Sequence, residues 1–160
     1  MTDMKIYLSF GREEKEGYEK KNVADLPQLQ DESVEEIQAL EVIEKVGSLI
    51  DFICECYRVL KPEGKAIFTS QYYTSIGAWK HPANRRGISE QSLNFADKNW
   101  REANNFYCGS LKDCDFEVIG SFAMEQDLMA RADDARAFWM RRYCNVVQAI
   151  MFTLTKKKNG

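Results

Sequence analysis

The sequence predicts a single α/β domain with a mostly parallel sheet that is covered by helices on both faces. Residues 34–43, 47–60 and 65–72 alternate as strand, helix and strand. Right-handed crossovers between parallel strands place the connecting helices over the sheet. The length of 160 residues, with 44% hydrophobic and 29% charged residues, is typical of one globular domain. We therefore expect residues 1–160 to form one domain.

The first thirty residues predict only short elements. Residues 4–10 read as a strand that ends at Gly11. Residues 12–21 are dominated by Glu and Lys, which favours a solvated loop or a short helix, and residues 22–26 read as an extended piece.

The central segment gives the strongest periodic signals. Residues 34–43 are rich in β-branched side chains and favour a strand, although their early glutamates also fit a helix start. Residues 47–60 predict a helix that Ser48 can cap, and Pro62 ends it before the strand at 65–72. The apolar stripe of this helix consists of Leu49, Ile50, Ile53, Tyr57 and Leu60.

The second half predicts a short helix at 89–95, a strand at 116–122, an amphipathic helix at 128–143 and a final strand at 145–155. The last strand is apolar and β-branched throughout, and its pairing is compatible with an antiparallel direction.

Composition argues against several kinds of partner. A formal net charge of −3 provides no basic face for nucleic acid, and the basic run at 156–158 fits a solubilising tail. Five scattered cysteines and the single histidine, His81, suit neither a disulfide framework nor a structural zinc site, so we expect no metal and a reducing cytoplasm. We also expect no signal peptide and no membrane span, because no apolar run approaches about 20 residues.

A series of motifs between residues 25 and 68 resembles the class I S-adenosylmethionine-dependent methyltransferases, of the type 11-like group. These motifs are Asp25-Leu26-Pro27, the run 31–37 (Asp-Glu-Ser-Val-Glu-Glu-Ile), the run 41–44 (Glu-Val-Ile-Glu), and the run 56–65 (Cys-Tyr-Arg-Val-Leu-Lys-Pro-Glu-Gly-Lys). The last of them is the most specific. The resemblance implies a three-layer, Rossmann-like methyltransferase fold that is abbreviated in its N-terminal half, with S-adenosylmethionine as cofactor.

The resemblance also implies where the cofactor would bind. In open α/β sheets, ligands lie outside the carboxyl ends of the central strands, at the switch in strand order. The implied cofactor-binding residues are Leu8, Ser9, Phe10, Gly11, Asp25, Leu26 and Glu41. Asp25 also fits a turn cap before Pro27, and Glu41 also fits a solvated strand end.

The implied substrate loops follow the strand at 65–72. A Trp, Pro and Arg-containing stretch at 79–86 resembles a later segment of some family members. The candidate substrate residues are Tyr72, Trp79, His81 and Arg86. His81 could act as a base or lie in an exposed loop, and the aromatic residues could line a pocket or pack. No residue stands out as the catalytic one, and the methyl acceptor is not indicated.

The chain departs from the family at the cofactor end. The first motif, Leu8-Ser9-Phe10-Gly11, lacks one glycine, and Phe10 adds bulk there. The second strand, with its ribose-binding acid, appears deleted, and Glu41 and Lys45 stand where the family has histidines. Two functions therefore follow: a methyltransferase of weak or lost activity, or a non-catalytic binding or assembly module that no longer binds the cofactor.

The missing second strand also predicts an assembly. The strand at residues 5–10 would keep an edge covered only by residues 22–26, and Ile6, Leu8 and Val23 would be exposed. Unpaired edges invite pairing with another chain, so we expect a two-fold dimer that buries this region.

Overall fold

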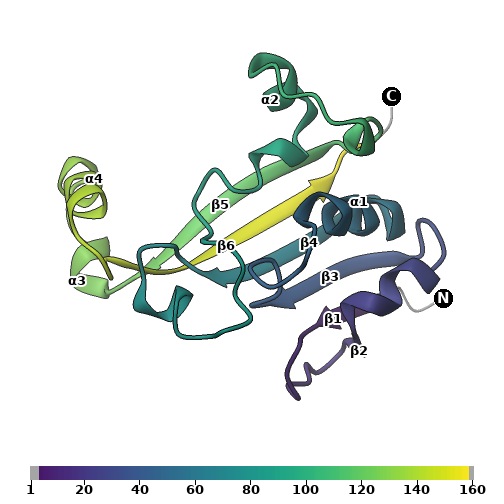
Figure 1. The fold of residues 1–160 in the computed structure, drawn as a ribbon, viewed down its shortest axis with the longest axis horizontal. Coiled ribbons are helices and arrows are strands. Elements are labelled where there is room, and N and C mark those ends of the chain that lie inside the picture. Colours follow the sequence, from purple (N-terminus) through teal and green to yellow (C-terminus); the bar gives the residue numbers. More distant parts are fainter. Residues whose placement is uncertain (1–3, 159–160) are drawn as a thin grey trace.

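The protein folds around one six-stranded sheet (Figure 1), seen here in a computed structural model that describes residues 4–158. The strand order is β2-β1-β3-β4-β6-β5. The strands are β1 (Met4–Leu8), β2 (Glu19–Lys21), β3 (Val34–Leu40), β4 (Leu60–Gln71), β5 (Phe116–Met124) and β6 (Val147–Lys156). The neighbours β2, β1, β3 and β4 pair in parallel, and β6 pairs antiparallel with both β4 and β5. The predicted fold class is confirmed.

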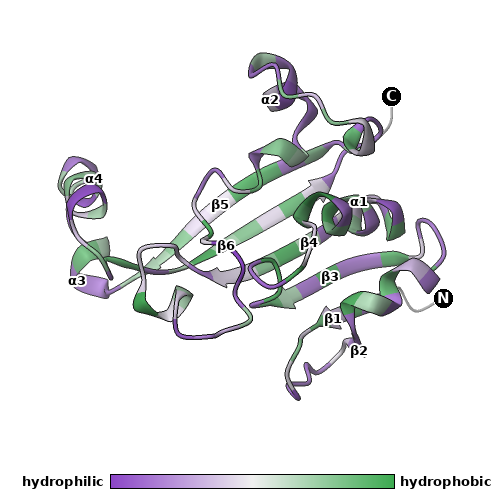
Figure 2. Cartoon of the chain, viewed as in Figure 1, coloured by the Kyte–Doolittle hydropathy of each residue, from purple (hydrophilic) through white to green (hydrophobic). Residues whose placement is uncertain are grey.

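Helix α1 (Leu49–Val59) covers one face of the sheet. The Ser48 side chain accepts a hydrogen bond from the Asp51 amide and so caps the start of the helix, as expected. The ring of Phe52 packs on Phe68 of β4, with 5.6 Å between ring centroids, and Tyr57 packs edge-on against Phe116 of β5 at 5.1 Å. Hydrophobic and polar residues alternate along the strands (Figure 2), so every second side chain enters this core.

The connection between β4 and β5 packs on the same side as α1. It contains short 3-10 turns, η2 (Ile76–Ala78), η3 (Asn94–Ala96) and η4 (Gly109–Leu111), and helix α2 (Lys98–Ala103). Arg101 is buried and donates hydrogen bonds to the carbonyl oxygens of Phe95, Leu111 and Cys114 at 2.7, 3.1 and 2.6 Å. These bonds fix α2 to the start of β5.

Within residues 4–158, no helix covers the opposite face of the sheet, in contrast to the expected cover on both sides. Along β4 and β6 the buried positions alternate with half-exposed or exposed ones, such as Ile67, Thr69 and Met151. Helices α3 (Gln126–Met129) and α4 (Asp133–Arg142) have no buried residue and extend beyond the sheet (Figure 1). The predicted single helix at 128–143 is wrong, because the chain breaks between α3 and α4.

Three local predictions in the first half are also corrected. A second strand is present: β2 lies within the segment predicted as loop or helix, and its backbone pairs with β1 from Ile6↔Glu19 to Leu8↔Lys21. Residues predicted as extended form the 3-10 helix η1 (Val23–Gln28). Because β2 covers the edge of β1, and Ile6 and Leu8 are fully buried, the basis for a dimer through this edge disappears.

The predicted helix at 89–95 is absent as well. The Ser89 amide donates to the Ser92 hydroxyl at 2.8 Å, and the segment forms turns that lead into η3. Such side-chain bonds offer the backbone an alternative to helix. Between residues 4 and 158, no helix is long and apolar enough to cross a membrane, and no group of three or more potential metal ligands is found.

Candidate functional site

A polar cavity of about 230 Å³ lies at the carboxyl ends of β1 and β3. The chain passes from β1 to β2 on one side and then returns to β3 on the other, so this is the switch in strand order. Ligands of open α/β sheets bind at such switch points. The cavity is lined by Ser9, Phe10, Gly11, Glu13, Leu40, Glu41, Lys45 and His81.

The turn after β1 forms one wall of the cavity. The Ser9 hydroxyl donates a hydrogen bond of 2.7 Å to the Glu13 carboxylate and accepts one of 3.0 Å from the Gly11 amide. The hydrogen bond from Ser9 is the main reason why the pKa of Glu13 lies below its usual value. Lys20, from β2, donates to the Gly11 carbonyl oxygen at 2.8 Å. The polar groups of this turn are therefore largely paired with one another.

The end of β3 forms the facing wall. Glu41 has a positive φ of 51°, and its amide donates to the Thr69 carbonyl oxygen at 2.8 Å. One carboxylate oxygen of Glu41 accepts a 3.0 Å hydrogen bond from Gln71, and the other lies 3.6 Å from the Lys45 ammonium. Lys45 also donates to the Glu41 carbonyl oxygen at 2.7 Å. The positive φ turns the chain sharply so that Glu41 and Lys45 meet at the cavity.

Glu44 is a buried carboxylate directly behind this wall, with only 2% of its surface exposed. Neither carboxylate oxygen has a hydrogen-bond partner among the described residues, and the nearest cation is Lys45, 3.7 Å away. Burial is the largest influence on the pKa of Glu44 and raises it above its usual value, and the Lys45 ammonium offsets this only in part. Burying this carboxylate therefore lowers the free energy of unfolding.

The loop that follows β4 closes the rim. Arg86 donates hydrogen bonds of 2.7–2.8 Å to the carbonyl oxygens of Ile43, Val46 and Gly47, which fastens the loop to the turn after β3. His81 reaches the cavity, and its Nδ1 accepts a 3.1 Å hydrogen bond from the Ala83 amide. Trp79 is 68% exposed, and its indole N–H donates to the Tyr73 carbonyl oxygen at 2.9 Å.

The structure brings together some of the sequence-predicted site residues and separates others. Ser9, Phe10, Gly11, Glu41 and His81 line the one cavity. The remaining residues have other roles in the structure. Leu8 and Leu26 belong to the hydrophobic core. The Asp25 carboxylate accepts a 2.9 Å hydrogen bond from the Asn22 amide at the start of η1, and the Tyr72 hydroxyl donates one of 2.7 Å to Glu90. Arg86 and Trp79 donate hydrogen bonds to backbone carbonyl oxygens, as described above. Whether any of them binds a ligand stays a prediction.

Three lining residues, Glu13, Leu40 and Lys45, were missed by sequence reasoning. Glu13 stands in a run of charged residues that reads as a solvated loop, and only its closeness to Gly11 hints at the site. Lys45 stands where the similar family has the second histidine of the turn at 41–45, and this position in the motif could have identified it as a site residue.

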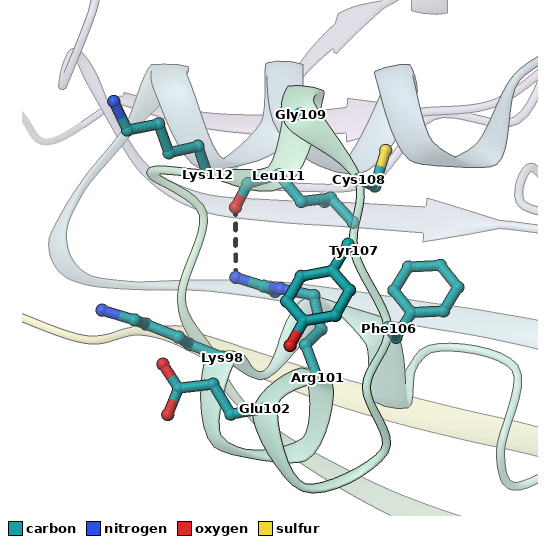
Figure 3. Close-up of a pocket in the computed structure, with 9 residues that line it drawn as sticks. All are labelled: Lys98, Arg101, Glu102, Phe106, Tyr107, Cys108, Gly109, Leu111 and Lys112. Carbon is teal, nitrogen blue, oxygen red and sulfur yellow. Dashed lines mark hydrogen bonds between the residues drawn. The ribbon is translucent and has the colours of Figure 1, made fainter.

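Two larger cavities lie at the opposite end of the parallel strands. One, of about 340 Å³ (Figure 3), lies between α2 and the residues around η4 and is lined by Lys98, Arg101, Glu102, Phe106, Tyr107, Cys108, Gly109, Leu111 and Lys112. In it Arg101 is committed to backbone carbonyl oxygens, including that of Leu111. The other, of about 540 Å³, includes Arg58 and Lys156. Both lie toward the amino ends of the parallel strands, so we place the candidate site at the smaller cavity.

Comparison with known proteins gives consistent results. A family model described as a methyltransferase domain matches residues 7–68, which span β1 to β4. A solved SAM-dependent methyltransferase from Archaeoglobus fulgidus is 12% identical, with a TM-score of 0.63, over 97% of this chain and 87% of that one. No match is found among curated proteins.

Further solved structures share the fold at similar distance. The YcgJ protein from Bacillus subtilis is 14% identical, with a TM-score of 0.51, over 89% of this chain and 71% of that one. The [4+2]-cyclase SpnF is 17% identical, with a TM-score of 0.54, over 89% of this chain and 56% of that one. The match in sequence falls on the strands that build the cavity, and the match in fold extends over the whole sheet. Residues 7–68 are thus similar to a methyltransferase domain, and the whole chain shares the fold of a solved SAM-dependent methyltransferase.

The residues at the cavity suit one end of the family's cofactor better than the other. Carboxylates and aromatic faces favour a sulfonium and an ammonium group, and this chain has Glu13, Glu41 and the 58%-exposed ring of Phe10 at the cavity. Beyond β2 the chain continues with Asn22, and Lys21 ends the strand. No carboxylate stands at these two positions to accept the ribose hydroxyls. The cavity therefore fits the methionine end of S-adenosylmethionine.

Proposed function

We propose that this chain is an S-adenosylmethionine-dependent methyltransferase that holds the methionine end of the cofactor between the turn after β1 and the end of β3. The observation that carries the proposal is the cavity at the switch in strand order, where the carboxylates of Glu13 and Glu41 line the same space. A cationic ligand would be attracted to both groups, and Lys45 is placed to pair with a ligand carboxylate. The bound cofactor would supply a methyl group that is already activated on a sulfonium.

The loop after β4 is the proposed acceptor side. Arg86 anchors it to the turn at 43–47, while Trp79 is largely exposed and His81 reaches the cavity rim. We propose that His81 accepts a proton from the methyl acceptor at Nδ1, which then gives up its hydrogen bond from the Ala83 amide, and that Trp79 contacts the apolar part of the methyl acceptor. Transfer from an activated donor needs mainly positioning, so a single base at the rim is sufficient. Tyr72 and Arg86 support this loop through the bonds described above.

A second candidate function is a non-catalytic module of the same fold. It is favoured by the turn after β1, where hydrogen bonds already pair the polar groups of Ser9, Gly11, Glu13 and Lys20 with one another. A ligand would have to compete with these bonds, and the ribose-binding carboxylate is missing after β2. The cyclase SpnF shares the fold, and its reaction is not a methyl transfer, so the fold does not fix the chemistry.

Calorimetric titration with S-adenosylmethionine and S-adenosylhomocysteine separates the two functions. Binding of both, with a Kd at least tenfold weaker in Glu41→Gln, supports the methyltransferase. The loss of a charge-assisted contact is worth about 1.5–3 kcal/mol. A matched control is Glu102→Gln, an exposed glutamate of α2 outside the cavity. If millimolar cofactor gives no binding heat and does not raise the melting temperature of the wild type, the methyltransferase function is contradicted. The non-catalytic module then remains as the proposed function.

The same titration tests the predicted role of Asp25. Because its carboxylate caps the start of η1, Asp25→Ala is expected to lower stability slightly. A parallel loss of cofactor affinity, measured with the variant fully folded by circular dichroism, would support an adenine-side role. Unchanged affinity would restrict Asp25 to the cap.

We further propose that residues 1–160 act as one domain in the cytoplasm and self-associate as a homodimer. Five free cysteines support a reducing compartment. The net charge of −3 makes nucleic acid an improbable acceptor. Gel filtration with light scattering tests the dimer, and localisation of a fluorescent fusion tests the compartment.

A further inference from the structure

The helix-free face of the sheet is unusual for a mostly parallel sheet. Parallel strands are normally covered on both sides, because βαβ crossovers place helices there. Here the loop at 9–18 covers part of β1 and β3, with Tyr18 bonded to Glu36 and Gln38. Among residues 4–158 this loop reaches β4 only beside Ile67 and Thr69, which share a cavity with Glu14 and Lys15, and it leaves β6 and β5 open, where Met151 is 43% and Ile119 is 56% exposed.

The residues on this three-strand surface follow directly from the strand register. We call it the bare face, and β6 runs along its middle with β4 on one side and β5 on the other. Four rows cross it: Lys65, Thr155 and Glu117; Ile67, Thr153 and Ile119; Thr69, Met151 and Ser121; Gln71, Ala149 and Ala123. The next residues in register, such as Phe68 and Phe152, point into the core under α1.

The rows are self-complementary about β6. Lys65 and Glu117 occupy matching places on β4 and β5, and neither has an ion-pair partner within the part of the chain that the structure describes. Two intervening strand spacings, about 10 Å in total, separate them within one chain. Ile67 and Ile119 likewise occupy matching places, and so do Thr69 and Ser121.

We infer that the bare face binds a second copy of this chain, with the two-fold axis parallel to β6 and lying between the two sheets. This rotation exchanges β4 and β5, so Lys65 meets Glu117 of the partner subunit, and Glu117 meets the partner's Lys65. The isoleucines of β4 and β5 meet in the same way, while Met151 and Thr153 face their own copies. An isologous interface requires this kind of self-matching surface. Two sheets packed face to face lie about 10 Å apart, with strands within about 30° of each other.

This assembly differs from pairing through the edge of β1, which β2 occupies. It also leaves the cavity at Glu41 open, because α1 and the loop after β4 lie on the other side of the sheet. The inference is therefore independent of cofactor binding. It assigns a role to the surface that the trimmed first half of the fold no longer covers with helices.

Charge reversal on the full chain tests the pairing. Light scattering of the wild type at micromolar concentration is expected to give twice the monomer mass of 18.5 kDa. Glu117→Lys and Lys65→Glu, each alone, are expected to weaken dimerisation at least tenfold, because each places two like-charge pairs in the interface. The double variant, which swaps both charges, is expected to restore the dimer. Glu102→Lys on α2 is the matched control and should leave the mass unchanged.

Two results would overturn the inference. A wild type that stays monomeric up to about 100 µM excludes a specific dimer of physiological strength. A dimer that survives both single reversals, or single variants that the double variant does not rescue, places the interface elsewhere. Circular dichroism and thermal unfolding establish that each variant is folded, and Ile119→Glu supplies an independent disruption at an exposed position that contributes nothing to the core.

Discussion

β4 pairs along most of its length with β3 on one side and β6 on the other, whereas β1 is backed on its outer side by a β2 of only three residues. The first region, β3 to β4 with α1, has a complete helix and a core of buried aromatic rings. The second region, β1 and β2, is joined by the polar loop at 9–18 and has no helix between its strands. The complete region therefore provides most of the stability, and the trimmed region provides polar groups for a ligand. The core is under α1, and the cavity lies where the trimmed region meets it.

The largest expected effect is in the complete region. Phe68→Ala removes a fully buried ring that packs on Phe52, and it should lower the free energy of unfolding by about 3–5 kcal/mol in urea denaturation. Phe10→Ala, at an exposed ring in the trimmed region, is the matched control and should change stability by less than about 0.5 kcal/mol. Similar losses for both variants would erase the distinction between the regions.

Arg58 joins α1 to η1 and the turn after it, which connect β2 of the trimmed region to β3, and its substitution should have the next largest effect. Its guanidinium donates to the carbonyl oxygens of Leu26 and Leu29 at 3.0 and 2.8 Å and pairs with Asp31 and Glu55. Arg58→Met keeps the aliphatic stem and should cost about 2 kcal/mol, because two carbonyl oxygens lose a charged donor. Hydrogen exchange should then speed up in η1 and leave β4 and β6 protected. Uniform loss of protection would mean that the two regions unfold as one unit.

Glu44 sharpens the comparison through pH. Burial raises its pKa above the usual 4.5, so the folded state holds the proton more tightly than the unfolded chain. The free energy of unfolding must then fall as pH rises above the unfolded value. Glu44→Gln has no buried charge at this position, so its free energy of unfolding should exceed that of the wild type by about 1 kcal/mol at pH 8. The difference in stability between the two proteins, measured by thermal unfolding, should become smaller toward pH 4. A difference that grows on acidification would mean that the pKa of Glu44 is lowered by folding.

The smallest expected effect is at Tyr18, in the loop of the trimmed region. Its hydroxyl bonds with Glu36 and Gln38 on β3, and burial is the main cause that raises its pKa to about 12. Tyr18→Phe should cost about 0.5–1 kcal/mol, the net value of a typical hydrogen bond. Tyr107→Phe, at an 85% exposed side chain, is the control and should be neutral. A cost above about 2 kcal/mol would show that the loop contributes to the core.

The sequence predicted the complete region well and the trimmed region poorly, for physical reasons. The helix at 47–60 has an apolar stripe, a capping Ser48 and a terminating Pro62, so local chemistry and packing agree. β2 consists of Glu19, Lys20 and Lys21, which have no strand pattern, and only backbone pairing with β1 makes them a strand. The break between α3 and α4 has no proline or glycine to announce it.

The candidate site was predicted in part. Phe10, Gly11 and Glu41 belong to motifs at strand ends, and strand ends meet at one edge of a parallel sheet. Glu13 and Lys45 come from loops, and their positions depend on the turn at Ser9 and on the positive φ at Glu41. Neither feature has a distinct signature in the residue pattern.

The position of β6 between β4 and β5 has a consequence for how the chain is made. β5 pairs only with β6, yet β6 follows it by more than twenty residues. At synthesis rates of about 5–20 residues per second, roughly 1–4 s pass between the end of β5 and the start of β6, with no strand beside β5. During that interval its unpaired backbone is open to other chains on the ribosome. Glu117, an exposed charge near the start of β5, is the kind of residue that opposes such pairing.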